Sequence, residues 1–215
     1  MYYLIYIIFS MLILYLGAAL ECDVCYTTNA ITCSGHYTKC DSSQNHCMMT
    51  LTQTTFGDVR VAVLEKSCGS VYQCTHTSSF STVGYAVSVD SVCCDTDYCN
   101  NGTMIWKQQN KTLNGVTCPS CFAKNSKSCD PRATVNCKGD ENHCIQFTVT
   151  KHRGDTIKFA GCASEGMGKS HGKAAFRGSS LDVTDFKYNN GQSLQNNPFI
   201  PLLTATTLTM IFLKR

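Results

Sequence analysis

The sequence predicts an all-β protein built from small, disulfide-rich modules, and three observations lead to this fold class. All sixteen cysteines lie between Cys22 and Cys162, in two blocks of nearly equal spacing. Segments rich in Thr and Val alternate with glycine-containing turns, which is typical of β-hairpins. Sustained helical periodicity is missing throughout. Because each module has few large apolar residues, cross-links must offset the small core.

The chain begins with an uncharged apolar stretch. Residues 1–19 end in Gly17-Ala18-Ala19, which predicts a secretory signal peptide that is cleaved after Ala19. The usual positive residues are missing, so an N-terminal membrane anchor is the alternative. A signal peptide places the mature protein outside the cell, where disulfides form.

The first predicted module spans residues 20–100. Its clearest strands are residues 48–55 and 59–66, joined by the turn Phe56-Gly57-Asp58, and residues 83–92 suggest a further strand pair. This module is the complete one, with ten cysteines: Cys22, Cys25, Cys33, Cys40, Cys47, Cys68, Cys74, Cys93, Cys94 and Cys99.

Two cysteines of this module, Cys93 and Cys94, are adjacent in the sequence. Neighbouring Cα atoms are ~3.8 Å apart across a trans peptide, whereas a disulfide usually requires roughly 4.4–6.8 Å. Successive side chains on a strand also point to opposite faces. We therefore expect Cys93 and Cys94 to have separate partners elsewhere in the chain.

Residues 101–117 are predicted to be a polar linker between the modules. The linker contains two acceptor sequons, Asn101-Gly-Thr103 and Asn110-Lys-Thr112. In a secreted protein these predict N-glycosylation at Asn101 and Asn110, which would hold the linker exposed.

The second module is predicted to span residues 118–162 and to be truncated. It repeats the first block of spacings, and its strands at 145–152 and 156–160 surround the turn Arg153-Gly154-Asp155. The module has only six cysteines: Cys118, Cys121, Cys129, Cys137, Cys144 and Cys162.

The remaining residues predict a stalk and an attachment signal. Residues 163–189 are rich in Gly, Ser and Lys, which favours a flexible stalk. Residues 190–215 combine a polar spacer with a short apolar tail, the pattern of a glycolipid (GPI) anchor signal that is removed. Asn189 is the preferred attachment residue and Gly191 the second choice. A tail that stays in the membrane, or a fully secreted product, is the alternative.

Charge is distributed unevenly between the two halves of the mature chain. Residues 20–103 contain three bases and eight acids, a net charge of −5, whereas residues 104–189 contain 13 bases and seven acids, a net charge of +6. Such an asymmetry can steer association with a charged partner. The acidic first module would suit a basic protein partner.

The cysteine pattern resembles one protein family. Cys-x2-Cys at the start of the first module and Cys-Cys-x4-Cys-Asn at its end are similar to the three-finger family of lymphocyte antigens and the urokinase receptor. The resemblance implies a three-finger fold, with the Asn100 side chain tying the last turn to the core. It also implies the pairs Cys22–Cys47, Cys25–Cys33, Cys40–Cys68, Cys74–Cys93, Cys94–Cys99, Cys118–Cys144, Cys121–Cys129 and Cys137–Cys162.

A chain with two such modules is similar to the gamma-type phospholipase A₂ inhibitors and their vertebrate relatives. This resemblance implies a non-enzymatic extracellular protein that recognises a protein partner, with a secreted phospholipase A₂ as one candidate. The alternative is a glycolipid-anchored receptor or adhesion accessory at the cell surface. We expect the first module to provide the main recognition surface.

Three local motifs have sharper interpretations. The two Cys-x2-Cys motifs suggest redox or zinc chemistry, but structural pairing is favoured within an even disulfide pattern. His46 and His143 both stand between Asn and Cys, which favours a structural role over metal binding. Arg153-Gly154-Asp155 matches an integrin ligand, whereas Phe56-Gly57-Asp58 at the equivalent turn favours turn chemistry alone. We expect no catalytic set, cofactor, metal or nucleic-acid site.

Overall fold

The structure is a computed structural model that describes Tyr3 and residues 19–190, except residues 75–76, 126–128, 131, 151–153, 171 and 177–180. Most of the predicted signal peptide and the whole tail after residue 190 therefore lie outside the described residues. Within the described part of the chain, no helix combines the length and the apolar character needed to cross a membrane.

The all-β prediction is confirmed. The described helical elements are one short α-helix, α2 (Glu165–Lys169), and two 3₁₀ turns, η1 (Val71–Gln73) and η2 (Lys173–Phe176). The strands are β1 (Glu21–Thr28), β2 (His36–Lys39), β3 (His46–Phe56), β4 (Val59–Gly69), β5 (Ser78–Thr82), β6 (Tyr85–Cys94), β7 (Leu113–Pro119), β8 (Cys121–Lys124), β9 (Thr134–Lys138), β10 (His143–Thr150), β11 (Thr156–Ala163) and β12 (Asp182–Asn190).

The predicted hairpins form the centre of the first module. Strands β3 and β4 pair without interruption from His46–Gly69 to Phe56–Val59, and β6 pairs with the other edge of β3. The turn at Gly57 has a positive φ of 56°, a conformation that glycine adopts without a side-chain clash. Strands β1 and β2 extend the sheet beyond β4.

The prediction that the second module ends at residue 162 and is followed by a flexible stalk is wrong. Strand β12, in residues 182–190, pairs with β10 along nearly its whole length, and α2 and η2 precede it. Val183 and Phe186 pack against the apolar core, which gives this segment a reason to fold. Because β7 begins at Leu113, we take the second module as residues 113–190 and the connector as residues 101–112.

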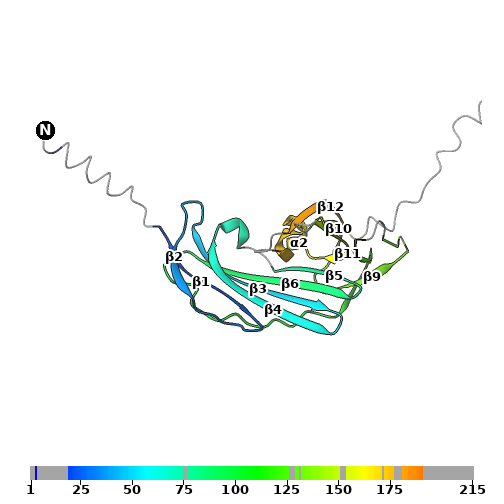
Figure 1. Ribbon diagram of the computed structural model, residues 1–215. Coiled ribbons are helices and arrows are strands. Elements are labelled where there is room, and N and C mark those ends of the chain that lie inside the picture. Colours follow the sequence, from blue (N-terminus) through cyan, green and yellow to red (C-terminus); the bar gives the residue numbers. More distant parts are fainter. Residues whose placement is uncertain are drawn as a thin grey trace, which may run out of the picture.

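The two modules share one sheet. Its strand order is β12-β10-β11-β5-β6-β3-β4-β1-β2, with β8 paired to β11, while β7 and β9 form a separate pair. The seam between the modules is short, because β11 joins β5 only at Cys162–Ser81 and Ala163–Phe80. In Figure 1 the strands of the first module form one long curved layer, and the yellow and orange elements of the second module gather at one end of it.

Gly161 makes this seam possible. A Cβ atom at position 161 would lie 2.1 Å from the carbonyl oxygen of Ser81 and 2.9 Å from the Cβ of Thr82. Such distances are far below van der Waals contact, so only glycine lets β11 approach β5 this closely.

Two apolar clusters stabilise the sheet. The larger joins both modules and contains Phe80, Val87, Val89, Ile145, Phe147, Val149, Phe159, Ala163 and Met167. The smaller lies in the first module under the connector and contains Met49, Leu51, Ala62, Leu64 and Met104. The first module therefore depends on the second to cover its β5–β6 hairpin.

Eight disulfides cross-link the chain, and none of the described cysteines is free. The first module has five, Cys22–Cys47, Cys25–Cys33, Cys40–Cys68, Cys74–Cys93 and Cys94–Cys99. The second has three, Cys118–Cys144, Cys121–Cys129 and Cys137–Cys162. These are the pairs that the family resemblance implies, and the adjacent Cys93 and Cys94 have separate partners.

Candidate binding surface

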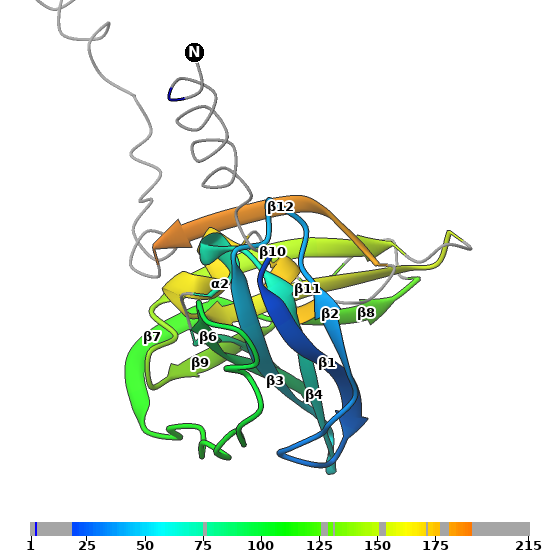
Figure 2. The ribbon, with the colours of Figure 1, turned by 90° about the vertical axis from the view of Figure 1, so that its left-hand side faces the viewer.

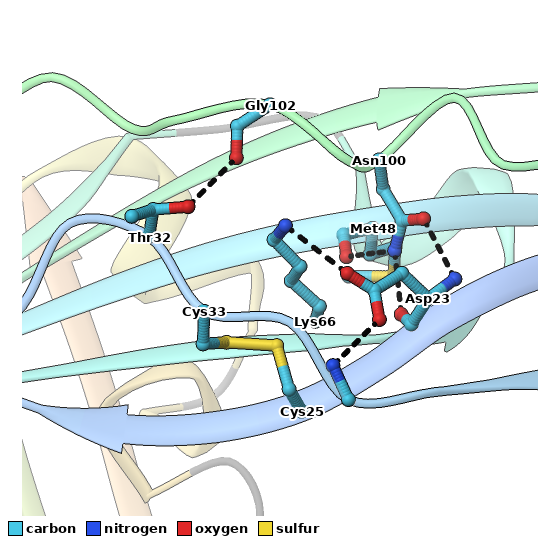
Figure 3. Close-up of polar contacts among 9 residues, drawn as sticks. Asp23, Cys25, Thr32, Cys33, Met48, Lys66, Asn100 and Gly102 are labelled. Atoms are coloured by element: carbon cyan, nitrogen blue, oxygen red, sulfur yellow. Dashed lines mark hydrogen bonds and ion pairs between the residues drawn. A yellow bond between two sulfur atoms is a disulfide. The ribbon is translucent and has the colours of Figure 1, made fainter.

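A buried polar anchor fixes the strands of the first module relative to one another. The amide nitrogen of Asn100 donates hydrogen bonds to the carbonyl oxygens of Asp23 (2.8 Å) and Met48 (3.2 Å), and the backbone N–H of Asp23 donates to the Asn100 amide oxygen (2.9 Å). Figure 3 shows this arrangement around the side chains of Asp23 and Lys66. Asn100, the last residue of the first module, is thereby tied to β1 and β3, which fixes the base from which the hairpins extend.

The charged side chains of this anchor satisfy each other. The ammonium of Lys66 lies 3.2 Å from one carboxylate oxygen of Asp23, and both side chains are almost completely buried. The backbone N–H of Gly35 donates to the other carboxylate oxygen at 3.0 Å. Breaking such a buried pair costs far more than an exposed one, because the remaining charge has no water around it.

One face of the first module's sheet is covered over only part of its width. Thr54 of β3 is paired with Val61 of β4 on one side and with Val87 of β6 on the other. Directly opposite residues share a face of the sheet, so Val61 and Val87 lie on the same face. Val87 is fully buried in the cluster shared with the second module, whereas Val61 is 41 % exposed.

The open half of this face carries an exposed apolar patch. Val59 is 61 % exposed and lies opposite Phe56, which is 55 % exposed. Tyr26 of β1 is 66 % exposed and lies opposite Glu65 of β4. Because Glu65 is four residues after Val61 on the same strand, Tyr26 lies on the same face as Val61. We call Tyr26, Phe56, Val59 and Val61 the open patch. Clustered exposed apolar and aromatic side chains are typical of protein interaction sites.

The opposite face of the same sheet is covered by the connector. Met104 packs into the cluster of Met49, Leu51, Ala62 and Leu64, and its backbone N–H donates to the carbonyl oxygen of Ile31 at 2.9 Å. Figure 2 shows the connector as the long green loop that leads from the first module to β7. The open patch is therefore on the face that the connector leaves free.

Aromatic contacts hold the edge of the open patch against the second module. The rings of Phe56 and Phe122 are 5.5 Å apart, and the ring of Tyr85 stacks on Phe122 at 5.4 Å. Burial raises the pKa of Tyr85 to about 12, which keeps its hydroxyl neutral. The backbone N–H of Gly57 donates to the carbonyl oxygen of Gly84, so the two hairpin tips are also joined.

A buried carboxylate, Glu141, also lies at the junction between the two modules. The Ser81 hydroxyl of β5 donates to Glu141 at 2.5 Å, and Glu141 is almost completely buried. Burial raises the pKa of Glu141, while hydrogen bonds from Ser81 and Ser79 and the charge of Lys138 lower it in part. This contact couples the modules electrostatically next to the seam.

The two predicted glycosylation sites lie on the connector. The side chains of Asn101 and Asn110 are both exposed. The backbone N–H of Thr112 donates to the Asn110 side-chain oxygen at 2.9 Å, which fixes the orientation of that side chain. Both positions are accessible for modification.

The Arg-Gly-Asp turn and the attachment residue lie on the second module. Arg153 is outside the described residues, and Gly154 has a positive φ of 82°. The carboxylate of Asp155 accepts a hydrogen bond from the Asn125 side chain at 3.1 Å, so turn formation accounts for both described residues. Asn189 is exposed near the end of β12, opposite Cys144.

The surroundings of the cysteine and histidine motifs indicate structural roles. The sulfur atoms of Cys22, Cys40 and Cys68 lie within 4.8 Å of one another, as do those of Cys118, Cys137 and Cys162. All six are in disulfides and so offer no thiolate for a metal. His46 and His143 begin the equivalent strands β3 and β10.

Sequence reasoning placed recognition on the first module but missed the open patch. The alternation of Val59, Val61 and Val63 was visible as a strand signal. What distinguishes this patch is that the second module covers only the neighbouring hairpin. Exposure of apolar residues on one half of a sheet face depends on tertiary packing, which spacing along the chain does not report.

Comparisons with known proteins agree on one family. The u-PAR/Ly-6 domain family matches residues 18–102 and 114–189. Phospholipase A2 inhibitor NAI of Notechis ater is 27 % identical over 158 residues, which cover 70 % of this chain and 77 % of that protein. Phospholipase A2 inhibitor gamma subunit A2 of Trimerodytes annularis is 23 % identical over 150 residues, covering 67 % and 81 %.

Two further proteins are also similar to this chain. Protein RoBo-1 of Rattus norvegicus is 30 % identical over 107 residues, which cover 48 % of this chain and 43 % of that protein. The crystal structure of mouse TEX101 aligns with 78 % of this chain and 98 % of its own, at 20 % identity and a TM-score of 0.31.

Proposed function

Because the chain belongs to the u-PAR/Ly-6 domain family, we propose that it is a non-enzymatic extracellular protein that binds a protein partner through the open patch. One observation carries this proposal. Among the described residues, the face that the second module buries at Val87 continues without a cover through Phe56, Val59 and Val61 to Tyr26. Aromatic and aliphatic side chains grouped in this way supply the anchors of protein interfaces.

We further propose a secreted phospholipase A₂ as the partner class. Two relatives that align with most of their length are named as phospholipase A2 inhibitors. The first module also has a net charge of −5 over residues 20–103, from three bases and eight acids, which would speed association with a basic enzyme.

The test measures binding of the full-length protein to a basic secreted phospholipase A₂. We expect Val61→Glu to weaken the equilibrium affinity by about 10-fold or more, since a buried charge replaces an apolar contact. Val92→Glu is the matched control. Val92 is 49 % exposed on β6, but it lies opposite Met49 and therefore on the connector face.

The outcomes separate the two parts of this proposal. Equal loss of affinity in both variants would contradict the open patch as the binding surface. No binding by the unmodified protein would exclude this enzyme class while leaving other protein partners to be tested on the same surface. Affinity that does not change between low and high salt would contradict the electrostatic contribution.

A glycolipid-anchored surface protein is the second candidate. Its supporting observation is the exposed Asn189 near the end of β12, which would place an anchor directly beside the folded sheet. Treating expressing cells with a phosphatidylinositol-specific phospholipase C tests this. Release of the protein supports the receptor class, and constitutive secretion into the medium contradicts it.

A further inference from the structure

The connector crosses the first module's sheet without filling the space beneath it. A hollow of about 780 Å³ lies between connector residues 106–111 and the strands β3, β4 and β6. Small-molecule and cofactor sites typically have volumes of roughly 300–1,000 Å³. Most of its strand residues lie on the connector face, and Val61 of the open patch also borders it.

The lining of this hollow has the chemistry that recognises a sugar. Half of the lining residues carry amides or hydroxyls, and one, Trp106, is a half-exposed aromatic ring. The uncharged polar members are Asn29, Gln53, Thr54, Thr55, Gln108, Gln109 and Asn110, and the cations Arg60, Lys107 and Lys111 also line the hollow. Sugars combine hydroxyl groups, which pair with amides, with apolar C–H faces, which pack on an aromatic ring.

One of these amides lacks a partner. The side-chain nitrogen of Gln53 is buried and has no hydrogen-bond acceptor among the described residues. A buried donor without an acceptor is unfavourable, so such groups usually pair with water or a ligand. Gln53 also lines the hollow, so a rotation of its side chain would bring this nitrogen to the hydroxyl and ring oxygens of a sugar there.

The hollow also contains an attachment point for such a sugar. Asn110 lines it, and the bond from the Thr112 N–H occupies the side-chain oxygen, which leaves the nitrogen for glycosylation. A Cβ at Gly139 would lie only 3.0 Å from the Cβ of Asn110, so the turn at Gly139 closes one side of this residue. The hollow lies on another side of Asn110, where space is open for a glycan.

We propose that an N-linked glycan on Asn110 folds back into this hollow, with its first N-acetylglucosamine residues packed on Trp106 and hydrogen-bonded to Gln53. The glycan then fills the space between the connector and the sheet, and it holds the connector in place across the face opposite the open patch. The protein thus supplies both the attachment residue and the binding site for its own sugar.

The test uses the chain's single tryptophan, Trp106, as an internal reporter. The full-length protein is produced in mammalian cells, and glycan occupancy is measured by mass spectrometry. We expect Asn110→Gln and Thr112→Ala to shift the tryptophan emission to longer wavelength and to increase its quenching by acrylamide. Because Thr112→Ala keeps the Asn110 side chain, a shared shift comes from loss of the glycan.

Asn101→Gln is the matched control, since it removes the other sequon of the same connector. We expect this variant to leave emission and quenching unchanged. An unmodified Asn110 in the wild-type protein would overturn the proposal. Identical emission and quenching in all four proteins would also overturn it, as would a shift of equal size in Asn101→Gln.

Discussion

The two modules reach stability by different routes. The first has five disulfides, a buried polar anchor at Asp23, Lys66 and Asn100, and a small apolar cluster around Leu51. The second has three disulfides, but it contributes most of the larger apolar cluster, including Phe147. Where cross-links are fewer, more apolar surface is buried.

This difference shows that disulfides and apolar packing can replace each other within one small fold. Cross-links mainly restrict the unfolded chain, whereas an apolar core stabilises the folded one. The replacement has a structural consequence here. The second module's core includes Phe80, Val87 and Val89 of the first module, so the better cross-linked module is also the incomplete one.

The largest expected effect comes from removing the second module. In residues 20–103 alone, Phe80, Val87 and Val89 would lose their cover, and each contributes about 1.5–3 kcal/mol when buried. The sum is comparable with the whole stability of a small domain. We therefore expect the fragment to be retained in cells or to aggregate, as measured by secreted yield and gel filtration against the full chain. A secreted, monomeric fragment with five disulfides would contradict this.

Phe147→Ala tests the larger cluster directly. Phe147 is almost fully buried and its ring contacts those of Phe80 and Phe159, so we expect a loss of about 3–5 kcal/mol in the free energy of unfolding. Urea denaturation measures it. Leu51→Ala, in the smaller cluster, is the control and should cost less. The opposite order would show that the first module's core is the more important one.

Gly161→Ala tests the seam. The added Cβ would meet the Ser81 carbonyl at 2.1 Å, so β11 or β5 must shift, and we expect a destabilisation of about 1–3 kcal/mol. Gly102→Ala is the control, because there the nearest atom, the Met49 Cε, lies at an ordinary 3.8 Å. Equal thermal midpoints for the two variants would show that the seam adapts without cost.

Glu141→Gln should have the smallest effect, and its sign depends on pH. Burial raises the pKa of Glu141 above its ordinary value of 4.5, so the folded state binds a proton more tightly than the unfolded state. The stabilisation that comes from this tighter proton binding is fully present below pH 4.5. It is lost as the pH rises through the pKa of Glu141 in the folded state. At neutral pH we expect Glu141→Gln to be neutral or stabilising by up to about 1 kcal/mol. A stability curve with the same pH dependence as wild type would contradict this.

Much of the fold follows from spacing, and the missed element shows where spacing fails. The hairpin predicted at residues 48–55 and 59–66 corresponds to β3 and β4. Strand β12 was missed because its apolar residues, Val183, Phe186 and Tyr188, do not alternate regularly. Its pairing with β10 shifts register between Gln146 and Thr148, and Asp185 has a positive φ of 51°. An irregularity of this kind hides a strand from any search for a period of two.

The candidate surface was harder to predict than the fold. The net charge pointed to the first module, but the open patch depends on the position of the second module over β5 and β6. That position is set by the two β5–β11 residue pairs, the close approach at Gly161, the shared apolar cluster and the ring contact of Phe122 with Phe56. Contacts between distant segments leave no periodic signal in either of them.

The short seam has a mechanical consequence. With an anchor at Asn189 and a partner on the open patch, a pulling force would pass from one module to the other through the two β5–β11 residue pairs and the shared apolar cluster, none of which is a covalent cross-link. The seam should open under load before the cross-linked modules do. The connector of residues 101–112 would then extend to about 40 Å, given roughly 3.3–3.6 Å per residue. The molecule would act as an extensible tether that keeps its partner bound while the load is absorbed.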